Sequence, residues 1–439
     1  MFSLKNWQDG ATWKNWSQSE RAKPNEFTLP HSIEEIQQII HRATTFNQTI
    51  RVTGAGHSFS PVAKPEEIAM SLHYMRGLVA IDLENMEATF YAGTYLHEIG
   101  PLLEAYHVAL YNMGDIQSQT LAGVVSTGTH GTGKDLGSFS SSVTKWGFVN
   151  GLGEWVEKHR EQDDLSNALH ISLGLLGILV TITIKVRPIY NLHYQAFKTN
   201  LLEEIPKMQA RIQTNRHVEW YYFPGSETVQ VKLMNEAPYA PRTKFERKKD
   251  ELALSVTENG LFYGLSEACR MQPKLSSFVA NVSSKAISNV EKNDVSYAIF
   301  PSPRLVKFNE TEHAVELQHL EAIVEEIHWT FVRAKLPVHF PIEIRVTNGE
   351  AGFLSPTQGK QSAFFAFHMY KGMNEQFYFN WVHELMRKYN SRPHWGKVNE
   401  YDRREIRKFY PDVNRFNEIR TQQDPHDVFQ TAFFQNVFK

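Results

Sequence analysis

The sequence of 439 residues contains a single cysteine, Cys269. One thiol cannot form an internal disulfide, so a disulfide-stabilised framework is excluded. The chain also lacks a long hydrophobic run: the most apolar stretch, 171–184, is interrupted by Ser172, Gly174 and Gly177 and falls short of the about 18 residues that a membrane-spanning helix needs. We therefore expect this stretch to lie in a protein core, and we expect no transmembrane segment.

An excess of positive charge is absent as well. Lysine and arginine number 46 against 48 aspartate and glutamate, and the net charge is −2, so the basic surface typical of nucleic-acid-binding proteins is not expected. The N-terminal residues MFSLKNWQDGATWKNW lack the basic-then-apolar order of a signal peptide, which favours a cytoplasmic location. What the chain does have is 41% hydrophobic and 12% aromatic residues, enough to fill the cores of two or three domains.

One glycine-rich loop almost matches a phosphate-binding motif. Residues 128–134 (GTHGTGK) fit the pattern G-x-x-x-x-G-K, but the next residue is Asp135, where the motif requires a serine or threonine to hold Mg²⁺. The following residues 136–142 (LGSFSSS) are also a poor start for the helix that should meet the phosphates. We therefore expect neither a nucleoside triphosphatase nor a metal site.

A second glycine loop, 54–58 (GAGHS), follows a short predicted strand over 49–52. It fails as a dinucleotide fingerprint because Phe59 occupies the position of the third glycine in G-x-G-x-x-G, and no helix is expected after Ser60-Pro61. Two loops that each depart from a standard nucleotide-binding motif indicate a different nucleotide-binding architecture.

Hydrophobic periodicity predicts an α+β protein. A capping box at Ser32–Glu35 begins a helix over 33–46, and a further helix runs through Ile99, Leu102, Leu103 and Tyr106. A β-branched strand over 178–186 closes the first region, with a boundary near residue 190. The remaining expected elements are strands over 78–82, 88–92, 229–234, 338–347 and 362–370 and a helix over 315–334.

The predicted strand 338–347 carries charged residues in a period of two. Its apolar residues Phe340, Ile342, Ile344 and Val346 share one face, and Glu343, Arg345 and Thr347 share the other. The pattern fits a solvated edge-strand face with a weak ion pair, and it also fits a functional pair about 7 Å apart along the strand. Periodicity alone does not distinguish the two.

Six segments in this order over most of the chain resemble the FAD-linked oxidases of the vanillyl-alcohol oxidase superfamily, in its branch of sugar-1,4-lactone oxidases and alditol oxidases. The segments are 52–59 (VTGAGHSF), 112–115 with 126–133 (NMGD and STGTHGTG), 173–178 (LGLLGI), 343–345 (EIR), 394–397 (HWGK) and the stretch from Asp424-Pro425 onward.

The resemblance implies a two-subdomain FAD-binding domain over 1–190, an α+β substrate (cap) domain with a large antiparallel sheet over 191–410, and a segment 411–439 that returns to the FAD domain. It implies oxidation of a gulono-, galactono- or arabinono-1,4-lactone by hydride transfer to flavin N5, with O₂ as the acceptor that yields H₂O₂. The alternatives are an alditol oxidase acting on xylitol or sorbitol, a dehydrogenase that uses another acceptor, and a flavin-binding protein that oxidises no alcohol.

The resemblance also assigns residues to FAD. His57 would be joined covalently to the flavin 8α-methyl group, and an alkylated imidazole there should raise the flavin's potential. His130 is expected to be structural rather than catalytic, and Lys134 to be an exposed loop lysine. The residues expected to bind the cofactor are Gly54, Ala55, Gly56, His57, Ser58, Gly114, Gly123, Ser126, Thr127, Gly128, Thr129, His130, Gly131, Gly177, Ile178, His394 and Lys397.

Catalytic roles follow from the same resemblance. Arg345 would stabilise negative charge on the reacting oxygen, with Glu343 holding Arg345 or a substrate hydroxyl, and Lys397 would lie near flavin N1–C2=O. Thr120 aligns near the flavin's reactive edge but could equally be a buried structural threonine, and His368 either lines the pocket or is a core histidine. Tyr370 departs from the small hydroxyl residue of relatives, which leaves the substrate open.

Overall fold

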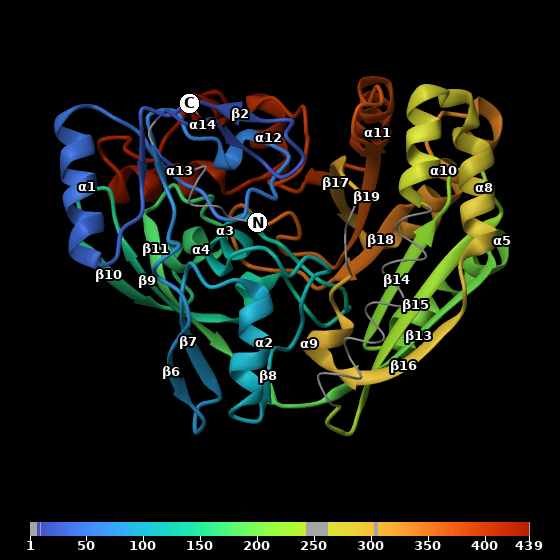
Figure 1. Cartoon of the computed structure of the whole chain (residues 1–439), viewed down its shortest axis with the longest axis horizontal. Coiled ribbons are helices and arrows are strands. Elements are labelled where there is room, and N and C mark those ends of the chain that lie inside the picture. The colour runs from blue at the N-terminus through green and yellow to red at the C-terminus, as the bar shows by residue number, and fades with distance from the viewer. Residues whose placement is uncertain (1–6, 9, 243–261, 303–305, 439) are drawn as a thin grey trace.

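The computed structural model of the chain describes residues 7–8, 10–242, 262–302 and 306–438. Two regions lie side by side, and each is built on an antiparallel sheet (Figure 1). The described residues combine helices with five sheets, of which the largest has eight antiparallel strands. The predicted α+β class with a large antiparallel sheet is confirmed.

The first region begins with a small parallel sheet in the order β3-β5-β4. The predicted helix is α1, where the Ser32 side chain accepts a hydrogen bond from the Glu35 amide and the Glu35 carboxylate accepts one from the His31 amide. Ile36, Ile40 and Ala43 form its buried face. The elements are β1 (Trp13–Lys14), β2 (Arg21–Ala22), β3 (Glu26–Thr28), α1 (Ile33–Thr45), β4 (Ile50–Val52) and β5 (Ile68–Met70).

A five-stranded antiparallel sheet, β10-β9-β11-β7-β6, completes this region. The predicted helix through Tyr106 is wrong at its end, because α2 stops at Glu104 and His107 takes a left-handed φ of 56° that turns the chain into β8. The elements are β6 (Leu78–Asp82), β7 (Glu87–Tyr91), α2 (Leu96–Glu104), β8 (Val108–Ala109), α3 (Leu121–Thr127), β9 (Val143–Val149), β10 (Trp155–His159), α4 (Asp164–His170), β11 (Ile178–Lys185) and β12 (Arg187–Pro188).

The second region contains the eight-stranded sheet, in the order β16-β13-β15-β14-β18-β19-β17-β20. Its elements are β13 (Asn191–Asn200), α5 (Leu201–Glu204), α6 (Met208–Thr214), β14 (His217–Tyr222), β15 (Thr228–Ala237), α8 (Ser276–Ala286), β16 (Val290–Val295), α9 (Ser296–Ile299), β17 (Phe308–Glu316), α10 (Leu320–Ala334), β18 (Ile342–Thr347), β19 (Ser362–Tyr370), α11 (Gln376–Lys388) and β20 (Arg392–Pro393).

Two predicted boundaries in this region are wrong. The strand expected from 338 begins only at Ile342, directly after Pro341, which has no amide to donate to a ladder. The helix expected from 315 begins at Leu320, because Val315 and Glu316 still pair with Ala363 and Ser362 as part of β17. Pairing with a distant strand outweighs the local helical pattern at these residues.

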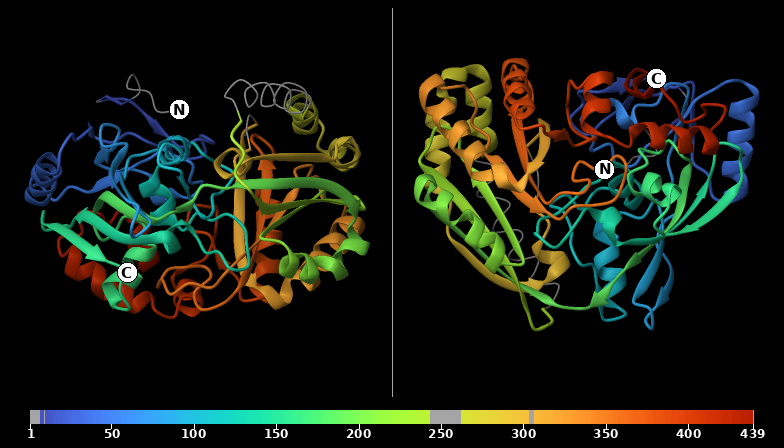
Figure 2. Two further views of the ribbon diagram at one scale, coloured as in Figure 1. Left: turned by 90° about the horizontal axis from the view of Figure 1, so that it is seen from below. Right: turned by 180° about the vertical axis from the view of Figure 1, so that it is seen from behind.

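Helices α5, α6, α10 and α11 cover one face of the large sheet, and the opposite face turns toward the first region (Figure 2). Along β14, the side chains of Val218, Trp220 and Tyr222 enter the core under the helices. Because side chains alternate along a strand, Glu219 and Tyr221 lie on the other face. The same alternation places the polar residues of β17, β18 and β19 between the two regions.

The last helices, α12 (Arg403–Phe409), α13 (Val413–Gln423) and α14 (Ala432–Phe438), lie beside the N-terminal strands (Figure 1). The Asp424 carboxylate accepts hydrogen bonds from the amides of Val428 and Phe429, each 2.9 Å long, and the Ile50 amide donates to the Val428 carbonyl over 2.7 Å. These bonds bring the end of the chain to β4.

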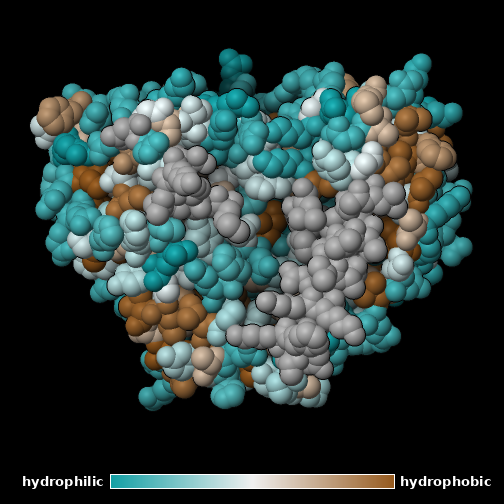
Figure 3. All heavy atoms as spheres, in the orientation of Figure 1, coloured by the Kyte–Doolittle hydropathy of each residue, from teal (hydrophilic) through white to brown (hydrophobic). Residues whose placement is uncertain are grey.

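Hydrophilic side chains cover much of the face in Figure 3, and hydrophobic ones gather at the lower left over the β6–β7 hairpin, where Val79 and Leu83 are exposed. None of the helices in the described residues has the length and apolar character to cross a membrane.

Candidate active site

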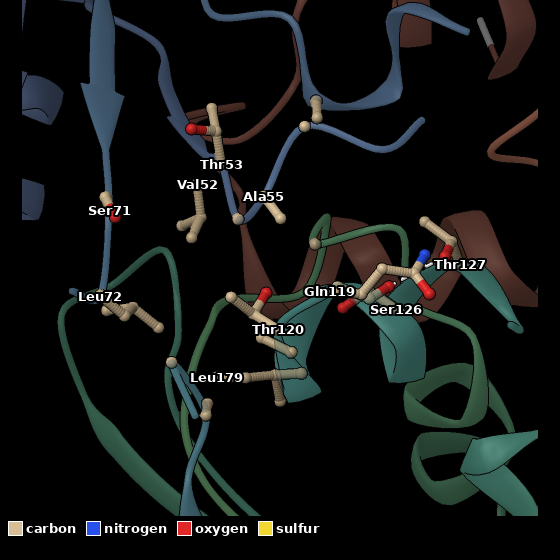
Figure 4. A pocket seen from close by; sticks show the side chains of 18 of the residues that line it. Val52, Thr53, Ala55, Ser71, Leu72, Gln119, Thr120, Ser126, Thr127 and Leu179 are labelled. Atoms are coloured by element: carbon tan, nitrogen blue, oxygen red, sulfur yellow. Dashed lines mark hydrogen bonds between the residues drawn. The ribbon is translucent and has the colours of Figure 1, made fainter. Parts of the chain in front are cut away.

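Between the first region's loops lies a hollow of about 970 Å³, here called the glycine-loop groove. Its walls come from the loop after β4, the start of α3 and the residues before β11 (Figure 4). Predicted residues that line it are Gly54, Ala55, Gly56, His57, Ser58, Thr120, Gly123, Ser126, Thr127 and Gly177.

Two glycines are required by this geometry. A Cβ on Gly54 would lie 2.3 Å from the Thr120 hydroxyl oxygen, and Gly177 has a φ of +155° with the Val149 carbonyl oxygen 2.6 Å from the position of a Cβ. Larger residues would therefore displace the loops that form the groove.

The groove is suited to a flavin dinucleotide. Val52, Leu72 and Leu179 give it apolar walls (Figure 4). Arg51 is buried at the groove with its Nε atom lacking a hydrogen-bond partner among the described residues, and burial lowers the pKa of Arg51 to about 10. Its other nitrogens donate to the carbonyls of Leu173 and Phe429. A buried guanidinium in a glycine-lined groove matches an anionic diphosphate.

His57 lies where the groove meets a second hollow of about 670 Å³. Its Nε2 atom is 2.8 Å from the Ser118 hydroxyl, its ring stacks on Trp16, and its buried Nδ1 atom lacks a hydrogen-bond partner among the described residues. Burial, with the positive charge of Lys397, lowers the pKa of His57 to about 4. The imidazole is therefore neutral near neutral pH, as a nitrogen nucleophile must be.

The second hollow, here called the acidic pocket, lies between the two regions. Of the predicted residues, it is lined by His57, Ser58, Gly114, Thr127, Thr129, His130, Glu343, Arg345, His368, His394 and Lys397. It also contains Asp115, Glu310 and Glu312. His57, Ser58, Gln119 and Thr127 line both hollows. A ligand in the groove can thus contact one in the pocket.

Arg345 is the centre of a buried ionic cluster. Its guanidinium lies 2.6 Å from the Asp115 carboxylate, 3.1 Å from that of Glu219 and 2.5 Å from that of Glu343. Burial alone would lower the pKa of Arg345, but the three carboxylates raise it well above its usual range. Arg345 is therefore always charged, and its orientation is fixed.

The solvated edge-strand interpretation of Glu343 and Arg345 is wrong. β18 is an interior strand that pairs with β14 on one side and β19 on the other. Glu343 is 5% exposed and Arg345 8%. Both side chains face the first region because the alternate residues Ile342, Ile344 and Val346 pack under the helices.

Lys397 forms a second cluster in the pocket. Its Nζ atom is 2.6 Å from a Glu310 oxygen and 3.7 Å from a Glu312 oxygen. Burial opposes the charge on Lys397, yet these two carboxylates raise its pKa. The other Glu312 oxygen is 3.3 Å from His130 Nε2. The His130 ring stacks on that of Phe364, with 3.7 Å between the ring centroids. Burial lowers the pKa of the neighbouring His394 to about 3, so that ring is neutral.

His368 and Tyr370 occupy the end of β19 beside this cluster. His368 lines the acidic pocket, and its Nε2 atom is 3.6 Å from Glu310. The Tyr370 hydroxyl donates to Glu267, and its ring stacks on Phe340. Tyr370 thus belongs to an aromatic wall next to the pocket rather than to its lining.

Some predicted residues lie outside both hollows. Gly128 ends α3 with a φ of +73°, and Ile178 begins β11 in the core. Gly131 lines a separate hollow with Asp135 and Lys185. The Lys134 ammonium donates to the Gln213 side chain over 2.8 Å, so this loop lysine has a protein partner.

The second glycine loop is fastened to the large sheet. The Gly133 amide donates to the Val346 carbonyl over 2.6 Å, and the Thr132 hydroxyl donates to the Val218 carbonyl over 2.7 Å. After β18, the Glu350 carboxylate accepts bonds from the Ser138 amide and hydroxyl. The loop beside the groove is therefore held by the strands that carry Glu219 and Arg345.

Sequence reasoning missed five charged residues of these sites: Arg51, Asp115, Glu219, Glu310 and Glu312. Asp115 lay inside a quoted motif, and a period-two pattern in 308–316 (FNETEHAVE) places Glu310 and Glu312 on one strand face. Glu219 gave no such signal, because its partner Arg345 is remote in sequence.

Comparison with known proteins adds a family to this geometry. The family model described as D-arabinono-1,4-lactone oxidase matches residues 182–437, and the model described as FAD binding domain matches residues 24–158. The chain belongs to the D-arabinono-1,4-lactone oxidase family. The predicted family, the FAD cofactor and the assignment as a flavin-dependent oxidoreductase are confirmed.

Full-length relatives support the same family. The chain is 28% identical over 434 residues to L-gulono-1,4-lactone dehydrogenase of Mycobacterium tuberculosis, covering 97% of this chain and 98% of the relative. It is 25% identical over 438 residues to L-gulonolactone oxidase of Mus musculus, covering 98% of each. The fold is similar to that of cholesterol oxidase from B. sterolicum, with a TM-score of 0.80 at 15% identity over 98% of this chain and 96% of that one.

Proposed function

We propose that this enzyme oxidises a sugar 1,4-lactone of the gulono-, galactono- or arabinono- type. The observation that carries the proposal is the junction at His57, where a groove suited to FAD opens into a pocket that contains Glu343, Arg345 and Lys397. Relatives of similar length are named for gulonolactone and arabinonolactone. Bound FAD would supply the hydride acceptor, and the protein residues would position the lactone and place charge around it.

Arg345 would donate hydrogen bonds to the reacting oxygen and stabilise negative charge that develops there. Its three carboxylate partners hold the guanidinium in one orientation before substrate arrives, which lowers the reorganisation needed during reaction. Glu343 would accept a hydrogen bond from a substrate hydroxyl while it keeps its contact with Arg345. The Lys397 ammonium, held by Glu310, would lie beside the flavin ring and stabilise added negative charge.

We propose further that FAD is attached covalently through His57. Three observations support this attachment: the imidazole is neutral, its buried Nδ1 atom has no hydrogen-bond partner in the described part of the chain, and the ring lines the groove. Thr120 lines the groove beside Gly54 and would contact the flavin.

Four further proposals complete the assignment. The flavin domain would span 1–190, the substrate domain 191–410 and the returning segment 411–439, because β13 begins the large sheet at Asn191 and α13 and α14 lie beside β4. O₂ would be the acceptor, and the location would be cytoplasmic, as the single cysteine favours. The balanced charge argues against a nucleic-acid partner.

An anaerobic substrate screen tests the activity. Gulono-1,4-lactone and arabinono-1,4-lactone should bleach the flavin absorbance, and xylitol and sorbitol should do so more slowly. The rates at which O₂ and a dye reoxidise the reduced flavin are then compared, which distinguishes an oxidase from a dehydrogenase. Faster bleaching by the alditols would assign the enzyme to alditol oxidation. Bleaching by none of the compounds would contradict the proposal and favour a flavin-binding protein without this activity.

A further inference from the structure

Carboxyl groups outnumber cations around the acidic pocket. Five buried side chains, Asp115, Glu219, Glu310, Glu312 and Glu343, surround two permanent cations, Arg345 and Lys397. Burial raises the pKa of Glu219. Without Glu219, four carboxyl groups still outnumber these two cations.

Each cation is already engaged by protein carboxylates. Arg345 contacts three of them, and Lys397 lies between Glu310 and Glu312. Of the nearby histidines, His130 and His368 direct their Nε2 atoms at Glu312 and Glu310, and His394 is neutral. A ligand carboxylate would have to compete with a buried protein carboxylate for either cation.

Strand register brings these carboxylates together on one wall. Glu310 lies opposite His368 in the β17–β19 pair, and Glu312 lies opposite Ala366, whose other neighbour is Glu343 on β18. Glu312 and Glu343 both line the acidic pocket, with the small side chain of Ala366 between their backbone positions. Carboxylates accept hydrogen bonds and donate none when ionised, and a wall of them is complementary to a ligand that presents several hydroxyl groups.

We propose that Glu310 and Glu312 make this pocket selective for neutral polyhydroxylated ligands and exclude the aldonate anion that forms when a lactone ring hydrolyses. This inference rests on the proposed lactone oxidation. Like charges in a water-poor site repel strongly, and placing such repulsion against an unwanted ligand is a common source of specificity. The same two residues position Lys397, which also lines the acidic pocket.

Inhibition by gulonate tests the inference. Gulonate, made by alkaline hydrolysis of gulono-1,4-lactone, is measured as a competitive inhibitor of the holoenzyme and of its Glu310→Gln and Glu312→Gln variants. We expect the inhibition constant of gulonate to exceed the dissociation constant of the lactone by at least about tenfold in the wild type. We expect it to fall by about tenfold in each variant, since one carboxylate is neutralised and Lys397 is released.

Three variants and one measurement make the result interpretable. Glu310→Asp keeps the charge and should keep gulonate excluded, which separates charge from packing. Glu316→Gln is the control, because Glu316 lies on the same strand but pairs with Lys360 at the surface. Flavin content shows whether each variant is folded. If Glu310→Gln does not fold, the Glu312→Gln variant provides the test.

Unchanged gulonate inhibition in both glutamine variants would overturn the inference, as would wild-type binding of gulonate as tight as that of the lactone. If the wild type oxidises no lactone, the proposed function fails separately. In that case gulonate binding to the wild-type and Glu310→Gln holoenzymes is measured by calorimetric titration instead of by inhibition. Tighter gulonate binding by the variant supports exclusion, and equal binding overturns it.

Discussion

Arg345 of β18 lies directly opposite Glu219 of β14, and its Nε atom is 3.1 Å from the Glu219 carboxylate. Glu219 is absent from the sequence motif that singles out Glu343 and Arg345. Its contact shows that the guanidinium is held from a neighbouring strand as well as from its own. The arginine is thereby oriented in part by a residue that lies outside every recognised motif.

Replacing Arg345 should slow the chemical step. Arg345→Met should lower the anaerobic rate of flavin reduction by about 10²-fold or more, from a contribution on the order of 3 kcal/mol, and Arg345→Lys should lower it less. FAD content should stay normal, because the groove lies in the first region. Arg415→Met, at an exposed surface pair with Asp164, is the control. A reduction rate within about threefold of wild type would remove Arg345 from the catalytic site.

The His57→Ala variant should lose covalent flavin. A carbon–nitrogen bond survives unfolding, so acid-precipitated wild-type protein should stay yellow and its denatured band should fluoresce, whereas the variant should release all its flavin. The exposed His97 provides a control, since His97→Ala should retain the coloured pellet. Wild-type flavin found entirely in the acid supernatant would show that the covalent assignment is wrong.

Removing the Lys397 charge should make the bound flavin harder to reduce. Lys397→Met should lower its midpoint potential by about 30 mV or more, which corresponds to about 1.4 kcal/mol for two electrons. The surface variant Lys360→Met should leave the potential unchanged, because Lys360 pairs with Glu316 away from the pocket. Spectroelectrochemical titration measures both, and equal potentials in Lys397→Met and wild type would place the ammonium too far from the flavin to act on it.

ATP with Mg²⁺ should neither bind nor be hydrolysed. Asp135 replaces the hydroxyl that would hold Mg²⁺, and Lys134 contacts Gln213. Calorimetric titration of ATP and Mg²⁺ into the protein should give no binding heat. Binding at micromolar ATP would show that residues 128–134 form a phosphate-binding loop after all.

Acid should destabilise the fold through His217. Its Nδ1–H donates to the Thr132 carbonyl over 2.6 Å, its Nε2 accepts from Arg216 over 3.1 Å, and burial lowers its pKa to about 3. The unfolded chain binds a proton near pH 6.5, so between about pH 6.5 and 3 it binds more protons than the folded chain. Stability is therefore full above about pH 6.5 and is lost as the pH falls.

Denaturant unfolding at about pH 7, 6 and 5 measures this loss. The contribution of His217 should approach about 1.4 kcal/mol per pH unit below pH 6.5. The His217→Gln variant should have a lower free energy of unfolding at pH 7. Its free energy of unfolding should also fall less steeply with decreasing pH, by that amount. Identical slopes for the two proteins would mean that His217 is not the titrating group.

The sequence by itself determined the local elements and the residue types of the site. The capping residues and apolar spacing that begin α1 act within a few residues, and the alternation that separates Glu343 and Arg345 from Ile342 and Ile344 is inherent in a strand. The glycine loops were recognisable because close backbone approach requires glycine at particular positions, as Gly54 shows beside Thr120.

Only the tertiary structure decided which charges meet and how deeply they are buried. The sequence pattern E-x-R is identical whether the strand lies at an exposed edge or in the interior of the sheet, as β18 does. The difference depends on strand order, which is set by pairing between residues far apart in sequence. The contacts of Arg345 with Asp115 and Glu219, and of Lys397 with Glu310, arise from that pairing and from the packing of the two regions. Buried ionic clusters depend on distances between remote segments, and local periodicity contains no information about those distances.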